Sequence, residues 1–215
     1  MANEVTRVKA VLLDGMGTLL RLVPPAPALA RALAIDEASA ERGFRAEVAY
    51  YLEHQLEGFD TERLANLRER CAAVMAEAAG VEPEAALEAL MRSLRFEAFG
   101  DAAPALTQLR DLGLRRVVVS NWDCSLPDVL DRVGLLTLVD AVVTSAVVGA
   151  AKPDPRIFAA ALDAAGCWGA EAVHVGDSLS NDVEGARRVG IRSVLLAREG
   201  AGDIRSLIEL PALLS

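Results

Sequence analysis

The chain has 215 residues, of which 53% are hydrophobic and 25% are charged, and its formal net charge is −9. This composition excludes a disordered chain and predicts one large domain, or a core domain that carries an insertion. The negative charge argues against binding to nucleic acid or to anionic membrane surfaces.

Cysteine content and hydropathy point to a cytoplasmic protein. The three cysteines, Cys71, Cys124 and Cys167, are widely spaced and form neither a disulfide framework nor a metal-binding pattern. The first ten residues lack the apolar stretch of a signal peptide, and no apolar run approaches the roughly 20 residues needed to span a bilayer. We therefore expect a cytoplasmic chain without a membrane segment, and no oligomeric state follows from the sequence.

The first predicted strand, residues 8–13, is a run of apolar residues that stops at Asp14, and a turn over residues 15–18 follows it. From about Pro24 to Phe99 we predict no strand. Helical patterning covers residues 36–58, 60–80 and 82–94, with Asp36 and Asp60 as N-caps. Residues 22–27 and 99–104 contain proline and glycine and are the predicted hinges.

After this helical region, short apolar strands alternate with helices. The predicted strands are residues 116–120, 141–145, 172–176 and 193–196, and the predicted helices are residues 102–112, 126–133, 155–165 and 182–189. Continuously apolar strands suit a parallel sheet that is buried on both faces. We therefore predict an α/β fold, a Rossmann-like doubly wound parallel sheet formed by residues 1–22 and 100–215, with residues 23–99 inserted as a helical cap.

Polar side chains follow four of the apolar runs. In an open α/β sheet, ligands bind beyond the carboxyl ends of the strands, so we expect these side chains to meet at one edge. Three carboxylates that lie close together repel one another, and a hard cation with oxygen ligands such as Mg²⁺ resolves that conflict. The residues are Asp14, Ser120, Asn121, Lys152, Asp177 and Asp182.

These stretches resemble the motifs of the haloacid dehalogenase-like hydrolase superfamily, most of whose members are phosphatases. The matches are "LLDGMGTL", "VVVSN", "AKPDPRIF" and "VHVGDSLSNDVEGA", and they occur in the order of the family. The resemblance implies a core with an inserted cap, as the element pattern also predicts.

The resemblance also implies roles for the polar residues. Asp14 would be the nucleophile that forms an aspartyl-phosphate, and Ser120 and Lys152 would hold the phosphoryl group. Asp177 would bind Mg²⁺ together with Asp14 and the backbone carbonyl of Met16, while Asp182 would orient Lys152 or a metal-bound water. We also place Thr18 and Asn121 among the phosphate-binding residues.

Met16 departs from the phosphatase pattern, which has an aspartate at this position as general acid and base. A thioether has no proton to give and almost no basicity. Members that dehalogenate carry an aromatic residue here and lack the Gly-Asp pair, whereas this chain keeps Gly176 and Asp177. Members that cleave phosphonates use a lysine of the cap, and residues 24–99 contain none.

Two functions therefore remain. The first is a Mg²⁺-dependent phosphatase of small molecules that is slowed or specialised by Met16, and the second is a non-catalytic member that binds a phosphorylated metabolite or a protein partner. The identity of the substrate does not follow from the sequence.

Several further residues have two interpretations each. Trp122 and Asp123 either face the cap and contact substrate, or Asp123 or Ser125 caps the helix from Leu126 with Asp128 completing a capping box. His174 lies in a strand and is predicted to be a core histidine. The aromatic and polar residues of one cap helix either read the substrate or pack against other cap helices; they are Tyr50, Tyr51, His54 and Gln55.

Overall fold

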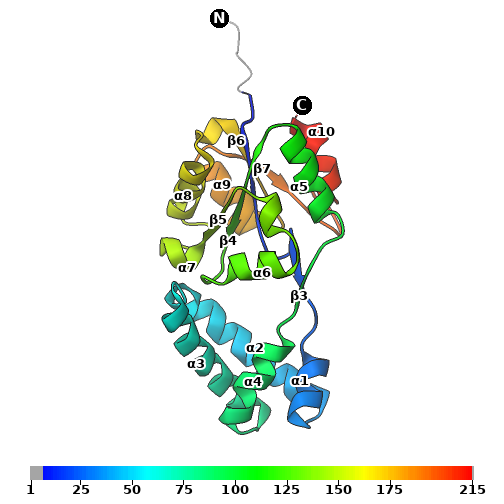
Figure 1. Ribbon diagram of the computed structural model, residues 1–215, viewed down its shortest axis with the longest axis vertical. Coiled ribbons are helices and arrows are strands. Elements are labelled where there is room, and N and C mark those ends of the chain that lie inside the picture. The colour runs from blue at the N-terminus through cyan, green and yellow to red at the C-terminus, as the bar shows by residue number, and fades with distance from the viewer. Residues whose placement is uncertain (1–6, 215) are drawn as a thin grey trace, which may run out of the picture.

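The computed structural model describes residues 7–214 and consists of two lobes joined by two chain crossings (Figure 1). One lobe contains a sheet with helices around it, and the other contains four helices. The crossings are β2 (Leu20–Leu22) and β3 (Phe96–Ala98), which pair as an antiparallel ribbon.

The five-stranded sheet is entirely parallel, with the order β5-β4-β1-β6-β7. Its strands are β1 (Ala10–Leu13), β4 (Arg115–Ser120), β5 (Ala141–Thr144), β6 (Ala172–Gly176) and β7 (Arg192–Leu195). The central strand β1 lies between β4 and β6, with Leu13 in register with Val118 and Val175. The predicted Rossmann-like α/β sheet is thereby confirmed.

The two faces of β1 explain why its sequence is continuously apolar. Val11 and Leu13 belong to one core cluster, which is covered by α5 (Ala102–Asp111), α6 (Leu126–Arg132) and α10 (Leu210–Leu214). Ala10 and Leu12 belong to a second cluster, which is covered by α8 (Pro155–Ala165) and α9 (Gly185–Arg188). Because helices lie on both faces of the sheet, no strand position of β1 faces water.

The helical lobe comprises α1 (Ala26–Leu33), α2 (Glu37–His54), α3 (Thr61–Ala79) and α4 (Pro83–Ser93), with a 3₁₀ turn at Gln55–Glu57. The side chains of Asp36 and Asp60 accept hydrogen bonds from the amides of Ser39 and Arg63, both at 2.8 Å, so both are N-caps as predicted. A separate apolar cluster fills the lobe. Among residues 7–214, no helix combines the length and hydropathy that a membrane span requires.

Two predictions for the helical region are wrong, and one helix of the sheet lobe was predicted only in part. A strand, β3, does exist between Pro24 and Phe99; its three residues are too few to show alternation and depend on pairing with the distant β2. Helix α1 begins at Ala26, inside the predicted hinge 22–27, because the prolines there suit the first turn of a helix. The helix predicted at 182–189 is correct for α9, while the residues before it form a π-helix, Leu179–Glu184.

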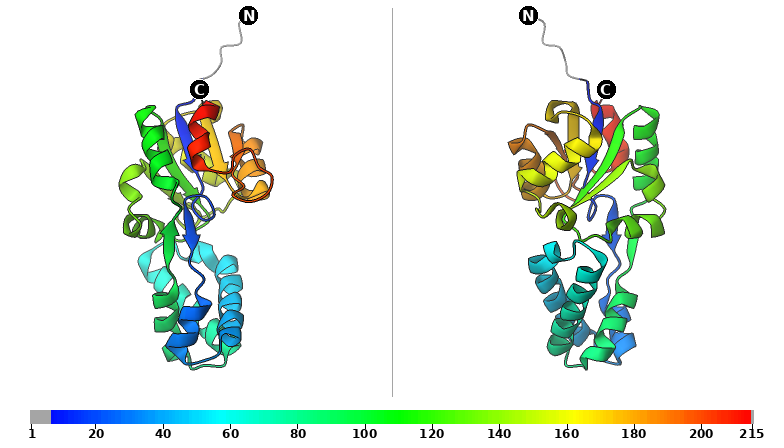
Figure 2. Two further views of the ribbon diagram at one scale, coloured as in Figure 1. Left: turned by 90° about the vertical axis from the view of Figure 1, so that its right-hand side faces the viewer. Right: turned by 60° about the vertical axis from the view of Figure 1, so that its left-hand side comes forward.

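The remaining short elements connect the strands and helices of the sheet lobe. They are α7 (Ser145–Val148) and the 3₁₀ turns Leu136–Leu138, Gly169–Glu171 and Leu207–Glu209. Figure 2 shows that the helical lobe lies beyond one end of the sheet, with the ribbon β2–β3 on one side of the space between the lobes.

Candidate active site

The carboxyl ends of β1 and β4 bring Asp14 and Ser120 together, and Lys152 reaches them from the loop after α7. The Lys152 ammonium donates to Oδ1 of Asp14 and to Oδ1 of Asp182, both at 2.6 Å. The Ser120 hydroxyl lies 3.4 Å from Oδ1 of Asp14. All four side chains are buried. These four residues, which are far apart in the sequence, thus form one polar cluster. It lies at the edge where ligands of open α/β sheets bind.

Lys152 is held in place by side chains around it. Asn121 accepts from the Lys152 amide at 2.6 Å and donates to the Lys152 carbonyl at 3.0 Å. Nε2 of His174 lies 2.9 Å from Oδ1 of Asp182, whose other oxygen accepts from the Ser178 amide at 3.0 Å. Asn121 therefore fixes the backbone of Lys152, and its contact with phosphate stays a prediction.

Charge is distributed unevenly over this cluster. Burial raises the pKa of Asp14 above its ordinary value, and the nearby Lys152 ammonium only partly opposes this. Burial alone would lower the pKa of Lys152, but its contacts with Asp14 and Asp182 raise it. For Asp182 the contacts with His174 and Lys152 outweigh burial and lower the pKa. Lys152 and Asp182 are therefore a stable ion pair, whereas burial disfavours the charged form of Asp14.

The carboxylates can hold a hard cation. Asp14, Asp177 and Asp182 each offer one oxygen, and these oxygens lie within 4.8 Å of one another. Burial raises the pKa of Asp177, and the charge of Asp182 adds to this. Gly17 makes the approach possible, because a Cβ there would lie 2.0 Å from Oδ2 of Asp177. An all-oxygen set with excess negative charge fits Mg²⁺.

The turn after β1 closes this cluster from one side. Gly17 has a φ of +83°, and the Leu19 and Leu20 amides donate to the Gly15 carbonyl at 2.9 and 2.8 Å. Met16 is partly buried, and its side chain packs against the first core cluster. The Thr18 side chain is buried, and its hydroxyl has no partner within residues 7–214. Its predicted contact with phosphate stays a prediction.

Helix α2 of the helical lobe contacts the sheet lobe beside this cluster. The Tyr51 hydroxyl donates to Oδ2 of Asp123 at 2.8 Å, and the Cys124 amide donates to the Gly58 carbonyl at 2.9 Å. Asp123, which follows the second motif, is buried. Asp123 therefore faces the helical lobe, as one of the two interpretations predicts, and its contact with substrate stays a prediction.

The predicted capping box of α6 does not form. Ser125 is the N-cap residue, but its side chain makes no capping bond, and Asp123 accepts from the Ser125 amide two residues on. On α2, the rings of Tyr50 and His54 stack at 4.0 Å, which agrees with packing inside the helical lobe. Gln55 is buried, and Oε1 of its side chain has no partner in the described part of the chain.

The sequence analysis missed two features of the site. His174 is a core histidine as predicted, but it also contacts Asp182, and burial lowers its pKa although this contact opposes the shift. Arg198 follows β7 and binds the turn after β1, with its Nη2 donating to the Thr18 carbonyl at 2.7 Å. The signal for Arg198 was its place just beyond the carboxyl end of a predicted strand.

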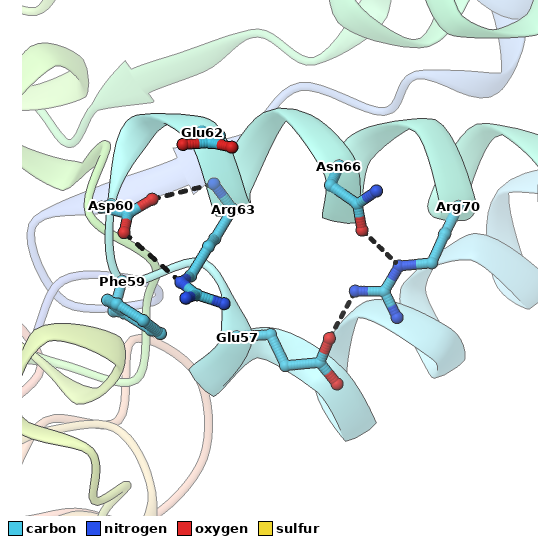
Figure 3. Close-up of a pocket in the computed structure, with 7 residues that line it drawn as sticks. All are labelled: Glu57, Phe59, Asp60, Glu62, Arg63, Asn66 and Arg70. Atoms are coloured by element: carbon cyan, nitrogen blue, oxygen red, sulfur yellow. Dashed lines mark hydrogen bonds and ion pairs between the residues drawn. The ribbon is translucent and has the colours of Figure 1, made fainter.

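A separate surface cavity of about 530 Å³ lies on the helical lobe (Figure 3). Its two arginines are already paired, Arg63 with Asp60 and Arg70 with Glu57 and Asn66. None of the residues of the polar cluster lines it. We assign no function to this cavity, which is lined by Glu57, Phe59, Asp60, Glu62, Arg63, Asn66 and Arg70.

Comparison with curated proteins finds several relatives. Haloacid dehalogenase-like hydrolase domain-containing protein 3 of Homo sapiens is 31% identical over 94% of this chain and 87% of its own length. The proteins of the same name from Danio rerio and Bos taurus are 37% and 47% identical, but the matches cover only 62% and 38% of those proteins. Phosphoserine phosphatase of Thermus thermophilus is 37% identical over 61% of this chain and 55% of its own.

Comparison with solved structures finds proteins of similar fold. A haloacid dehalogenase-type phosphatase from Thermococcus onnurineus superposes with a TM-score of 0.67 and 30% identity, over 97% of this chain and 98% of its own. L-2-haloacid dehalogenase from Xanthobacter autotrophicus has a TM-score of 0.72 at 23% identity, over 96% and 98%, which shows a shared fold. The sequence pattern of the haloacid dehalogenase-like hydrolases matches residues 8–190. The chain therefore belongs to the haloacid dehalogenase-like hydrolase family.

Proposed function

We propose that this protein is a Mg²⁺-dependent phosphatase that hydrolyses phosphate monoesters of small molecules through an aspartyl-phosphate on Asp14. The observation that carries the proposal is the pair of 2.6 Å contacts through which Lys152 joins Asp14 and Asp182 at the carboxyl edge of the sheet. Phosphatases among the relatives support the reaction class.

In the proposed reaction, a carboxylate oxygen of Asp14 attacks phosphorus and the bond to the ester oxygen breaks. Lys152 and the Ser120 hydroxyl lie beside that carboxylate and would bind the phosphoryl oxygens. Asp182 and Asn121 keep Lys152 at the site and so act as positioning residues. Water then hydrolyses the aspartyl-phosphate, which releases phosphate and restores Asp14.

Asp14, Asp177 and the backbone carbonyl of Met16 would hold Mg²⁺. When bound, the ion would neutralise the negative charge of the phosphate and of the carboxylates. The close approach of three carboxylate oxygens supports such a site.

Met16 leaves the proposed site without a general acid. The leaving oxygen must take its proton from solvent, so the protein should favour esters whose leaving group is stable as an anion. Met16 also favours a second candidate, a non-catalytic member that binds a phosphorylated metabolite or a protein partner. In both cases we propose that residues 23–99 form a cap over the site, and that the protein acts in the cytoplasm.

Hydrolysis of p-nitrophenyl phosphate by wild type and Asp14→Asn, with and without Mg²⁺, separates the two candidates. Turnover that requires Mg²⁺ and is lost in Asp14→Asn supports the phosphatase. Binding of inorganic phosphate by calorimetry without turnover supports the binding protein. Thermal unfolding of Asp14→Asn serves as the folding control.

A further inference from the structure

Arg198 joins three parts of the molecule that meet beside the site. Its Nη2 donates to the Thr18 carbonyl at 2.7 Å, and its Nε lies 3.4 Å from the Gly17 carbonyl. Nη1 and Nη2 also donate to the two carboxylate oxygens of Asp101, at 3.0 and 3.1 Å. The guanidinium carbon lies 3.5 Å from the centre of the Phe99 ring. One partly buried side chain thus binds the turn after β1 and the segment that follows β3.

We propose that Arg198 is a positioning residue that holds the turn Gly15–Thr18 against Asp177 and couples this turn to residues 99–101, the segment that follows β3 where the chain returns from the helical lobe. This inference rests on the proposed function, because the turn would supply backbone groups for phosphate and Mg²⁺.

The geometry of the peptide explains how Arg198 acts on the site. In a trans peptide the carbonyl and the following N–H point to opposite sides. Because Arg198 binds the carbonyls of Gly17 and Thr18, it directs the amides of Thr18 and Leu19 away from itself. The Leu19 amide donates to the Gly15 carbonyl at 2.9 Å, which closes the turn around Met16.

Asp177 also limits the position of the turn. Gly17 approaches Asp177 so closely that no side chain fits between them, since a Cβ would lie 2.0 Å from Oδ2. The turn therefore lies against Asp177 at Gly17, and Arg198 binds the carbonyls of Gly17 and Thr18. Loss of Arg198 would free the turn to move and would change the position of the Met16 carbonyl.

Asp101 connects Arg198 to the C-terminal segment as well as to the segment that follows β3. Its Oδ2 accepts from the Ser206 hydroxyl at 2.7 Å and from the Leu207 amide at 2.9 Å. The Phe99 amide donates to the Leu19 carbonyl at 3.0 Å. Because arginine presents several donors in one fixed plane, it can bind a carboxylate and two carbonyls at once, which lysine cannot do.

The test compares Arg198→Met with Arg116→Met. Arg116 also binds one carboxylate, Asp140, with its guanidinium, but it lies near the amino end of β4, away from the site. For Arg198→Met we expect at least a tenfold weaker Mg²⁺ affinity in calorimetry and faster hydrogen exchange in residues 15–20 and 96–102 together. The Mg²⁺ concentration for half-maximal turnover should rise by the same factor, with the KM for substrate changing less than twofold at saturating Mg²⁺. Arg116→Met should lower the melting temperature without these effects.

Arg198→Lys keeps the proposal testable if Arg198→Met fails to fold. Lysine retains the charge but cannot bind Asp101 and both carbonyls, so we expect a folded protein with weakened Mg²⁺ affinity. Full Mg²⁺ affinity in either folded variant, or unchanged exchange in residues 15–20, overturns the proposal. Calorimetry and exchange need no turnover, so they judge Arg198 even if the wild type proves to be inactive.

Discussion

The Tyr51 hydroxyl donates to the Asp123 carboxylate at 2.8 Å and links helix α2 of the helical lobe to the loop after β4. The Asp123 amide in turn donates to the Tyr51 oxygen at 3.3 Å. Burial raises the pKa of Tyr51, and the negative charge of Asp123 raises it further, so the phenol stays protonated and remains a donor. This contact lies directly after the second motif and links the two lobes.

Tyr51→Phe should weaken the docking of the helical lobe. The change removes a hydrogen bond to a buried carboxylate, which is typically worth about 1.5–3 kcal/mol. We expect the Cys124 amide, which donates to the Gly58 carbonyl across the same contact, to exchange its hydrogen about tenfold faster or more. Hydrogen exchange followed by NMR or mass spectrometry measures this.

Tyr50→Phe is the matched control for Tyr51→Phe. Tyr50 lies on the same helix, but its hydroxyl accepts from Arg70 within the helical lobe at 2.9 Å. Exchange at Cys124 should remain unchanged in this variant. An equal acceleration in both variants would mean that loosening of α2, and not loss of the link to Asp123, is the cause.

The stability of the protein should depend on pH through Glu47. Burial raises the pKa of Glu47 from its ordinary 4.5 to about 7, and the hydrogen bond from Cys71 opposes this only partly. The protonated form is therefore favoured in the folded state. Its contribution to stability is fully present below pH 4.5 and is lost as the pH rises through 7, by at most about 3 kcal/mol.

Glu47→Gln removes this titration, so urea denaturation should show a smaller loss of stability between pH 5 and pH 8 than in wild type. Glu53→Gln is the control, because Glu53 is exposed on the same helix. If wild type and Glu47→Gln lose stability in parallel over this range, Glu47 is not the titrating group.

The sheet could be predicted from sequence because its signals are local. Most strands of the sheet contain a short apolar run, and β1 is apolar throughout since both of its faces are covered. The ribbon β2–β3 could not be predicted, because Leu20–Leu22 and Phe96–Ala98 become strands only by pairing across the whole helical lobe. The split of the last predicted helix into a π-helix and α9 has no local signal that we can identify.

The polar cluster could be predicted for a related reason. Asp14, Lys152 and Asp182 follow apolar runs, and parallel strands bring such positions to one edge. Arg198 and Tyr51 are different, because what matters is their contact with a carbonyl or a carboxylate of a distant segment. With 20 arginines in the chain, no local feature distinguishes Arg198 except its place after β7.

Met16→Asp should increase the hydrolysis of alkyl phosphates. Under the proposed function the site lacks a general acid, and such assistance is typically worth about 10²–10⁴-fold in rate. Aryl phosphates need less help from protonation, so the ratio of alkyl to aryl turnover should rise. Steady-state kinetics on one alkyl and one aryl ester measure this ratio.

Met16→Asn is the matched control for Met16→Asp, because asparagine has nearly the shape of aspartate but neither gives nor takes the proton. A gain in Met16→Asn equal to that in Met16→Asp would assign the effect to polarity or shape at this position.

Gly17→Ala should disrupt the site far more than its backbone strain alone explains. Gly17 has a φ of +83°, and a Cβ there would lie 2.0 Å from Oδ2 of Asp177. Gly80→Ala provides the comparison, since Gly80 has a φ of +76° at the end of α3 and a Cβ would meet nothing within 4 Å. Both variants incur the strain of the left-handed region, about 1–2 kcal/mol. Only Gly17→Ala must also displace Asp177, so we expect its Mg²⁺ affinity in calorimetry to fall at least tenfold while that of Gly80→Ala is unchanged. Equal affinities in the two variants would show that the contact between Gly17 and Asp177 does not shape the cation site.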